Sequence, residues 1–293
     1  MKSLSYLALG GTLFIPASHS SLNTIVNEQK YSGLKSVVID FEDGLESKMF
    51  EDAMSVLDSV LKNISTLSPY VFLRARDSEH LEELLLLNTI SAVTGFVLAK
   101  FSLRNADTYL ELLQDKEFYI MPSIEGSELF NHQELQQLKE KILTNKQKVL
   151  LVRFGLEDML RQLGMRRKCD ESIFDFSSTS SVIGNFIATF KSAGFGVSGG
   201  VYPCFKDREG FTQDVQRDLK EGLFSKTIIH PSQIETINGL YRVSKKEFDE
   251  ADEIVSSSSN LFSQNNKMVE LITMEPHSQS ILQRASIYGV IES

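Results

Sequence analysis

The chain has 293 residues, of which 42% are hydrophobic and 24% are charged, a composition typical of an ordinary globular protein. Its 30 basic and 39 acidic residues give a net charge of -9, which disfavours nucleic acid as a general partner. The length suits either one large α/β barrel or two smaller domains.

The opening segment, MKSLSYLALGGTLFIPASHSS, has two interpretations. A lysine, an apolar run from Leu4 to Ile15 and small residues over 17–20 suit a secretory signal peptide, which would make the protein a secreted binding protein. The same apolar run suits the first buried strand of a cytoplasmic enzyme. The rest of the chain has to decide between them.

Apolar runs rich in Val, Ile, Leu and Phe recur along the chain, with longer helix-like patterns such as 46–64 and 178–194 between them. Buried strands that alternate with helices predict a parallel sheet covered on both faces, and eight such units predict an α/β fold of the (β/α)8 TIM-barrel type. Closing this barrel requires the first run, so we favour the strand interpretation and a cytoplasmic location. The eight runs occupy residues 5–17, 36–43, 70–76, 95–101, 118–125, 148–158, 195–205 and 225–231.

The barrel is expected to span residues 1–255, with residues 256–293 forming a C-terminal extension that packs on the barrel or on a neighbouring subunit. The extension starts with a Ser/Asn-rich stretch over 256–266, which is typical of a loop or linker. Cys169 and Cys204 lie far apart in the sequence, and we expect two reduced thiols. The longest uncharged stretch, 84–99, is too short and too interrupted for a membrane span, so no membrane association is expected.

Ionisable residues follow six of the apolar runs. In a parallel barrel the carboxyl ends of the strands share one face, where active sites are built from several strands. We therefore expect these residues to converge on one site. They are Asp40, Glu42, Asp43, Arg74, Arg76, Lys100, Glu125, Asp158 and His230.

Glu125 and Asp158 are the pair chosen on chemical grounds, because two carboxylates at a barrel rim suit a hard cation such as Mg²⁺ that keeps waters for substrate to replace. Helix capping or ion pairing is the structural alternative. Arg74 is suited to clamping a carboxylate or stabilising charge on an oxygen, or it neutralises Asp40 or Glu42. Lys100 is either a Schiff-base nucleophile or one more cation in this network.

Ordered motifs over most of the chain carry a resemblance to a known family. In order, the sequence contains LFIPA, VVIDFEDG, FLRAR, GFVLAK, IMPSIEG, VRFGLEDMLRQLG, SAGFGVSGGVY and EGLFSKTIIHPSQIETIN. Together they resemble the citrate lyase beta-subunit-like branch of the aldolase/citrate lyase superfamily, from about Leu9 to Ile254. The resemblance implies a barrel that uses a divalent cation, Mg²⁺ or Mn²⁺, to cleave or form a carbon–carbon bond beside a carbonyl.

The resemblance also implies roles for individual residues. The family's metal-binding glutamate and aspartate fall on Glu125 and Asp158, and its substrate-binding arginine falls on Arg74. Its acidic cluster, which orders water and supports the arginine, falls on Asp40, Glu42 and Asp43. Glu275 occupies the place of an acidic residue that related lyases bring from a neighbouring subunit as general base. Family members are trimers or hexamers, so a homotrimer or homohexamer is expected.

Departures from the family motifs concern the substrate. The opening motif lacks the usual arginine and glycine, the arginine motif gains a second cation at Arg76, and Arg153 stands where strand alternation points it inward with Gly155. We therefore assign Arg74, Arg76, Lys100 and Arg153 to substrate binding, and expect an unusual, more anionic substrate.

Two functional hypotheses follow. The first is a Mg²⁺-dependent carbon–carbon lyase or aldolase acting on a small β-hydroxy or oxo acid, or on its acyl-CoA thioester. The second is a non-catalytic or assembly-dependent ligand-binding barrel subunit of a larger complex. The presence of Glu125, Asp158 and Arg74 together favours the enzyme, because a barrel that only binds a ligand has little need for both a cation site and an arginine that clamps a carboxylate.

Overall fold

The structure, a computed structural model, describes residues 4–43, 45, 47–264 and 267–292. The start of the opening segment, residues 1–3, and the end of the Ser/Asn-rich stretch, residues 265–266, lie outside the described residues. The chain divides into two compact units, Met1–Ile234 and Glu235–Ser293. The predicted domain boundary at residue 255 remains a prediction, and the helix α10 (Lys245–Ser256), placed before that boundary, lies in the second compact unit.

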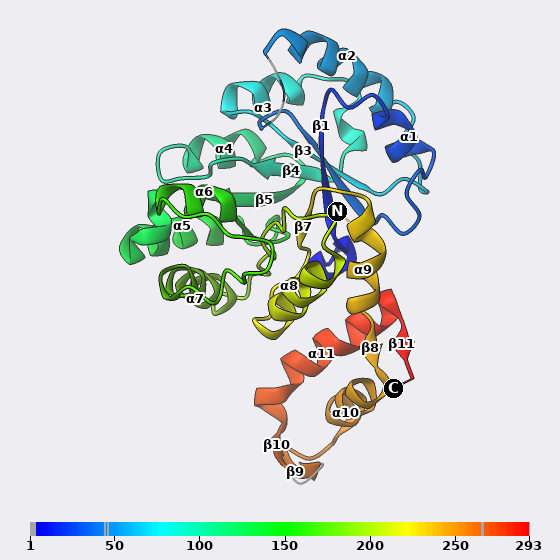
Figure 1. Cartoon of the computed structure of the whole chain (residues 1–293), viewed down its shortest axis with the longest axis vertical. Helices are drawn as coiled ribbons and strands as arrows, with labels where there is room; N and C mark the ends of the chain where they lie inside the picture. Colours follow the sequence, from blue (N-terminus) through cyan, green and yellow to red (C-terminus); the bar gives the residue numbers. More distant parts are fainter. Residues whose placement is uncertain (1–3, 44, 46, 265–266, 293) are drawn as a thin grey trace. The chain divides into compact units, whose positions relative to one another are not determined.

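Seven parallel strands form one curled sheet in the first unit, in the order β6-β5-β4-β3-β2-β1-β7 (Figure 1). Pro16 pairs with Asp40, and Asp40 pairs with Arg74, so the carboxyl ends of three neighbouring strands lie level. The strands are β1 (Thr12–Pro16), β2 (Ser36–Asp40), β3 (Tyr70–Arg74), β4 (Gly95–Leu98), β5 (Tyr119–Ile124), β6 (Arg153–Phe154) and β7 (Thr227–Ile228).

The barrel closes through a segment that is not a regular strand. Val152 N–H donates to the Gly196 carbonyl at 2.9 Å, and Phe224 N–H donates to the Val197 carbonyl at 3.0 Å. These bridges link the β6 side of the sheet to the β7 side, which confirms the barrel but not the predicted strand over 195–205. The glycines of this segment explain why it is not a regular strand. A Cβ on Gly199 would stand 2.1 Å from Oδ2 of Asp218, so the Asp218 side chain packs directly on the backbone here.

Helices alternate with the strands, and α2 to α5 lie along the outer side of the sheet (Figure 1). The helix predicted over 46–64 begins at the 3₁₀ turn η2 (Ser47–Met49) and buries Ala53, Leu57, Val60 and Leu61, whereas Met49 and Val56 are exposed. The segment before β1 forms a 3₁₀ turn, η1 (Tyr6–Leu9). The helices are α1 (Leu22–Asn27), α2 (Phe50–Leu61), α3 (Ser78–Leu85), α4 (Ala106–Leu113), α5 (His132–Leu143), α6 (Leu156–Gln162), α7 (Ser177–Lys191), α8 (Arg208–Lys220) and α9 (Ser232–Leu240), with 3₁₀ turns η3 (Ile90–Ala92) and η4 (Ser127–Phe130).

The interior of the barrel is apolar at the end of the strands away from the charged residues. Val38, Phe72, Val97 and Met121, from β2 to β5, pack together with Leu9 and Leu151. Burying apolar side chains of this size contributes about 1.5–3 kcal/mol each. This cluster supports the polar layer that the same strands carry further along.

Cys169 and Cys204 form a disulfide, so the prediction of two reduced thiols is wrong. Their Cα atoms lie 5.7 Å apart because the fold brings the loop after α6 against the loop before α8. The Tyr202 hydroxyl lies 2.5 Å from the Cys169 carbonyl and 2.7 Å from Oδ2 of Asp207, and it holds the same two loops together. Sequence separation alone gave no indication of this proximity.

A buried cluster of four charged residues joins α8 to the start of β7. The Lys226 ammonium lies 2.5 Å from Oδ2 of Asp214 and 2.7 Å from Oδ2 of Asp218. Arg167 donates to Oδ1 of Asp214 at 2.8 Å and to the Val201 carbonyl at 2.8 Å. Burial raises the pKa of the Asp218 carboxyl to about 6, although Lys226 opposes this shift. The cluster fixes the positions of Val201 and of the β7 strand.

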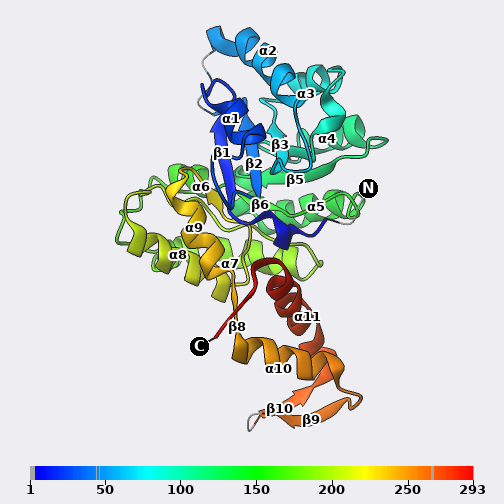
Figure 2. The same cartoon turned by 90° about the vertical axis from the view of Figure 1, so that its right-hand side faces the viewer.

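The second unit is built on a pair of helices, α10 and α11 (Leu271–Tyr288), with a hairpin at one end of the pair (Figure 2). Its core contains Val243, Ala251, Ile281 and Ala285. The strands β8 (Val243–Ser244) and β11 (Val290–Ile291) pair in parallel, and β9 (Leu261–Gln264) and β10 (Lys267–Glu270) pair antiparallel. Part of the stretch predicted as a loop is therefore a strand. Within the described residues, none of the helices has the length and apolar character to cross a membrane.

Candidate active site

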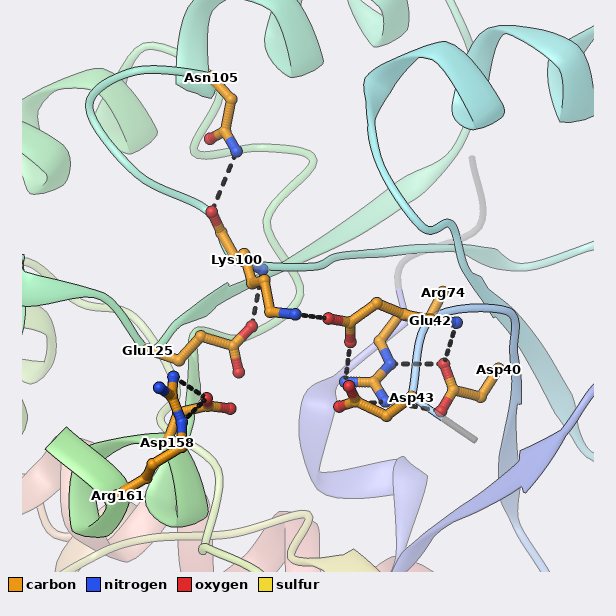
Figure 3. Close-up of polar contacts among 9 residues, drawn as sticks. All are labelled: Asp40, Glu42, Asp43, Arg74, Lys100, Asn105, Glu125, Asp158 and Arg161. Atoms are coloured by element: carbon orange, nitrogen blue, oxygen red, sulfur yellow. Dashed lines mark hydrogen bonds and ion pairs between the residues drawn. The ribbon is translucent and has the colours of Figure 1, made fainter. Parts of the chain in front are cut away.

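Arg74 stands at the end of β3, enclosed by three carboxylates (Figure 3). Its Nε and Nη2 donate to the two oxygens of Asp40, both at 2.6 Å, which is the bidentate geometry of a strong ion pair. Nη1 lies 2.8 Å from Glu42, and Nη2 lies 3.1 Å from Asp43. Among the described residues, the hydrogen bonds to Asp40 and Asp43 use Nε and both hydrogens of Nη2, so Nη1, which is ion-paired with Glu42, is the part of the guanidinium left to donate to a ligand.

Lys100 links this cluster to Glu125. Its backbone has a φ of 47°, an unusual conformation for a non-glycine residue, and it directs the Lys100 N–H to Oε1 of Glu125 at 2.7 Å. The Lys100 ammonium pairs with Glu42, and Asn105 donates to the Lys100 carbonyl at 3.0 Å (Figure 3). Burial raises the pKa of the Glu42 carboxyl, against the effect of Arg74. The side chain of Lys100 is therefore a network cation in this structure, which corresponds to the second of its two predicted roles.

Glu125 and Asp158 line a pocket of about 400 Å³ at the carboxyl ends of the strands. Glu125 is 6% exposed, and burial raises the pKa of its carboxyl to about 7, with Glu42 and Asp158 adding to this effect. Asp158 lies on α6 and accepts two hydrogen bonds from Arg161 on Oδ1, at 2.7 and 3.2 Å. Glu125 Oε2 and Asp158 Oδ2 receive no hydrogen bond from the described residues.

These two oxygens fit a hard cation. Carboxylate oxygen is the ligand type such ions prefer, and a bound cation would favour the ionised form of the buried Glu125. Among the described residues, no group of three or more His, Cys, Asp and Glu side chains is arranged to hold a metal. A cation held by this pair would therefore keep several positions for water or for substrate oxygens.

Gly155 makes room for Glu125. A Cβ at this position would stand 2.2 Å from the Glu125 Cβ and 2.8 Å from Oε2. Gly155 N–H also donates to the Ile124 carbonyl at 3.0 Å, so the backbone cannot easily move away. The glycine thus fixes where the Glu125 carboxylate lies.

Gly155→Ala is expected to displace the Glu125 carboxylate, to weaken cation binding, and to lower the free energy of unfolding by about 1–3 kcal/mol through overpacking. The matched control is Gly184→Ala in α7, where a Cβ would meet nothing within 4 Å. The control should raise the free energy of unfolding by about 0.5–1 kcal/mol. Urea denaturation of both variants checks the effect, and equal stability of the two would contradict the steric argument.

The structure brings together most of the predicted site residues, but not all of them. Glu42 and Lys100 stand behind the pocket, in contact with Arg74 and Glu125. Arg76 is exposed, stacks 4.7 Å above the ring of Phe50 and does not line the pocket. Glu275 lies in α11 of the second unit and accepts a hydrogen bond from Gln279 at 2.9 Å. The predicted residues that line the pocket are Asp40, Asp43, Arg74, Glu125, Arg153 and Asp158.

His80 lies beneath the loop that carries Arg76. Its ring packs edge-on against Phe41 and Phe50, at centroid distances of 4.9 and 4.7 Å, and Nδ1 accepts from the Arg76 N–H at 3.2 Å. Burial lowers the pKa of His80 to about 4, from about 6.5 in an unfolded chain. The imidazole is therefore neutral in the folded protein at neutral pH.

His80 should make stability depend on pH. The unfolded chain binds a proton at His80 more readily than the folded protein, so its contribution is complete above about pH 6.5 and is lost as the pH falls toward 4. His80→Phe removes this proton uptake. Between pH 7 and pH 5, the variant is expected to lose less unfolding free energy in urea than the parent protein. Parallel losses in the two proteins would contradict the assignment.

The pocket residues that were not predicted from the sequence include Phe14, Ser123 and Thr227. Ser123 lies two positions before Glu125, so strand alternation places both on the same face, and this spacing could have identified it. Phe14 and Thr227 come from β1 and β7, whose neighbourhood is created by the barrel. Their sequence positions carry no comparable indication.

Comparison with known proteins identifies the family. The chain is 26% identical to the beta subunit of citrate lyase from Escherichia coli over 153 residues, which is 50% of this chain and 49% of that protein. It is 27% identical to (3S)-malyl-CoA thioesterase from Cereibacter sphaeroides over 103 residues, 35% of this chain and 34% of that protein. The matched segments thus span between a third and a half of the length of these relatives.

Solved structures share the fold at lower sequence identity. CitE from Mycobacterium tuberculosis, in complex with magnesium, acetoacetate and coenzyme A, superposes with a TM-score of 0.68 at 19% identity, covering 96% of this chain and 99% of that one. A citrate lyase from Burkholderia xenovorans gives a TM-score of 0.72 at 18% identity, covering 97% and 94%. Residues 3–290 match the family described as C-C bond lyase of the TIM-barrel fold. The chain therefore belongs to this lyase family, as a divergent citrate lyase beta-like member.

Proposed function

We propose that this protein is a Mg²⁺-dependent carbon–carbon lyase or aldolase that acts on a small β-hydroxy or oxo acid. The observation that carries the proposal is one pocket lined by Glu125, Asp158 and Arg74, in which each carboxylate keeps an oxygen without a hydrogen bond from the described residues. Membership of a carbon–carbon bond lyase family supports the reaction class. Related structures in complex with magnesium and oxaloacetate support the cation and a carboxylate ligand.

Glu125 and Asp158 are the residues that would hold Mg²⁺. When bound, the ion supplies a Lewis acid that polarises a substrate carbonyl. The chain contributes the placement: the Lys100 N–H and Gly155 orient Glu125, and Arg161 orients Asp158. Because no third His, Cys, Asp or Glu side chain of the described residues completes a metal-binding group with this pair, room remains for an oxo acid to bind through its own oxygens.

Arg74 would stabilise the negative charge that develops on the substrate when the carbon–carbon bond breaks. Asp40 fixes the plane of its guanidinium, and Nη1 is the donor group available to the substrate. Asp43 is the most exposed of the three acids around Arg74, with 64% of its side chain accessible, so it is the one a substrate carboxylate displaces at least cost. Asp40 and Glu42 would then remain as the positioning residues.

A general base is still needed to remove a proton from the substrate hydroxyl in the cleavage direction. Glu275 remains our candidate, supplied by a neighbouring copy in a homotrimer or homohexamer, and cytoplasmic location and oligomeric state remain predictions. Use of an acyl-CoA thioester is supported by the names of two relatives, malyl-CoA thioesterase and a CitE bound to coenzyme A. The observation in support of the alternative, a ligand-binding subunit of a larger complex, is that one relative is a subunit of citrate lyase.

Two measurements separate the enzyme from the binding subunit. The first is turnover of short β-hydroxy and oxo acids and of their CoA thioesters, with Mg²⁺ and with EDTA. The second is exchange of the protons beside the product carbonyl with deuterated water, which reports enolate formation without a partner protein. We expect both to require Mg²⁺. Carboxylate binding without turnover or proton exchange would overturn the proposal in favour of a ligand-binding subunit.

A further inference from the structure

Arg153 lies at the floor of the pocket, where a barrel normally carries an aliphatic side chain. It comes from β6, is 2% exposed and pairs in register with Ser123 of β5. Its Nη2 donates to Oγ1 of Thr227 at 2.7 Å, and its Nη1 lies 3.7 Å from the sulfur of Met121. The guanidinium therefore reaches across the barrel interior from β6 to β7.

Phe14 fixes Arg153 relative to Arg74. The guanidinium carbon of Arg153 lies 5.0 Å from the centroid of the Phe14 ring, and that of Arg74 lies 5.3 Å from the same centroid. Each contact is a cation–π interaction worth about 0.5–2 kcal/mol. One ring thus holds two arginines in the same pocket, at positions set by three different strands, which gives the pocket two separate anion-binding groups.

The surroundings of the two arginines differ. Arg74 lies among three carboxylates, and two hydroxyl groups, those of Ser123 and Thr227, line the pocket beside Arg153. Because the Thr227 oxygen already accepts from Arg153, its own hydrogen is available to donate to a ligand. A planar guanidinium beside hydroxyl donors is a donor set suited to a carboxylate.

We infer that Arg153, Ser123 and Thr227 form a second carboxylate subsite that determines specificity for short dicarboxylic acids. This inference rests on the proposed function, because it places the reacting end of the substrate at Glu125, Asp158 and Arg74. The distal carboxylate lies at the pocket floor, against Arg153. A terminal methyl group at that place would form no charge-assisted hydrogen bond with Arg153 and no hydrogen bond with the two hydroxyl groups, so it would be bound less tightly.

Malate and 2-hydroxybutyrate test the subsite, because they differ only by a terminal carboxylate in place of a methyl group. Calorimetric titration with Mg²⁺ present should show that the parent protein binds malate about 10–100-fold more tightly, the range expected for charge-assisted hydrogen bonds. Arg153→Met should remove this preference and leave the affinity for 2-hydroxybutyrate unchanged. Arg153→Lys should retain part of it, because it keeps the charge and loses the planar fork.

Thr227→Val and Ser123→Ala supply a milder test that keeps Arg153 in place. Each should reduce the preference for malate several-fold. The inference is overturned if Arg153→Met keeps the preference, if it weakens both acids equally, or if the parent protein binds the two acids alike. Turnover of monocarboxylic acids without a preference for malate would contradict the subsite and support the lyase. A preference for malate without any turnover would contradict the lyase and support the subsite.

Discussion

Glu125→Gln should lower the affinity of the protein for Mg²⁺ by about 100-fold or more, because loss of a direct ligand exceeds the roughly 10–100-fold effect of losing its supporting partners. The substitution keeps the shape of the side chain, and its amide oxygen can still accept the Lys100 N–H that now lies 2.7 Å from Oε1. Only the charge and one ligating oxygen are lost. Asp158→Asn should have a similar effect, with its contact to Arg161 weakened.

The measurement is calorimetric titration of each variant with Mg²⁺ in the absence of substrate, so that no reaction needs to be known. Glu117→Gln is the matched control, since Glu117 is exposed and precedes β5 at the end opposite Glu125. It should bind Mg²⁺ as the parent does. If Glu125→Gln and Asp158→Asn bind Mg²⁺ as tightly as the control, the cation lies elsewhere.

Lys226→Met should lower the free energy of unfolding by about 3–5 kcal/mol, which is the effect of removing one partner from a buried ion pair. The side chain of Lys226 is 2% exposed and lies within 2.7 Å of both Asp214 and Asp218. Methionine has a similar length and fills the space, so the main loss is electrostatic. Two carboxylates would then share Arg167 as the remaining cation of this cluster.

Urea denaturation checks this prediction, with Lys220→Met, at an exposed position on α8, as the control expected to change stability by less than about 0.5 kcal/mol. A second variant separates charge from packing: adding Asp218→Asn to Lys226→Met should restore part of the lost stability, because one uncompensated charge is removed. If the double variant has a lower free energy of unfolding than Lys226→Met, the cluster does not stabilise the protein through its charges.

The shared location of the charged residues at the strand ends was predictable, because all strands of a parallel barrel point the same way. Any residue that follows a buried strand lies on the same face as the residues that follow the other strands. Asp40, Arg74, Glu125 and Asp158 meet at one pocket for this reason. Arg76, two residues beyond Arg74, stacks on Phe50 instead, so a position just after a strand does not by itself place a side chain in the pocket.

Contacts between distant segments were not predictable in the same way. The Cys169–Cys204 disulfide joins loops on either side of α7, and the segment 196–200 closes the barrel through two bridges, at Val197 and Ser198, where a full strand was expected. The contribution of Lys100 to the site was also not predictable from its charge, because its backbone N–H, directed by a positive φ, orients Glu125. Each of these depends on atoms that become neighbours only when the chain folds.

The alternation of strands and helices, the barrel, and the charged residues at its carboxyl-terminal face follow from the amino-acid sequence, because hydrophobic periodicity is a local property of the chain. Which of those residues share the pocket, and how each is held, follows only from the folded arrangement. Folding brings the Phe14 ring into contact with both Arg74 and Arg153, and Gly155 against Glu125. Such arrangements depend on the register between strands and on close packing across the barrel, and neither is written in the order of residues along one segment.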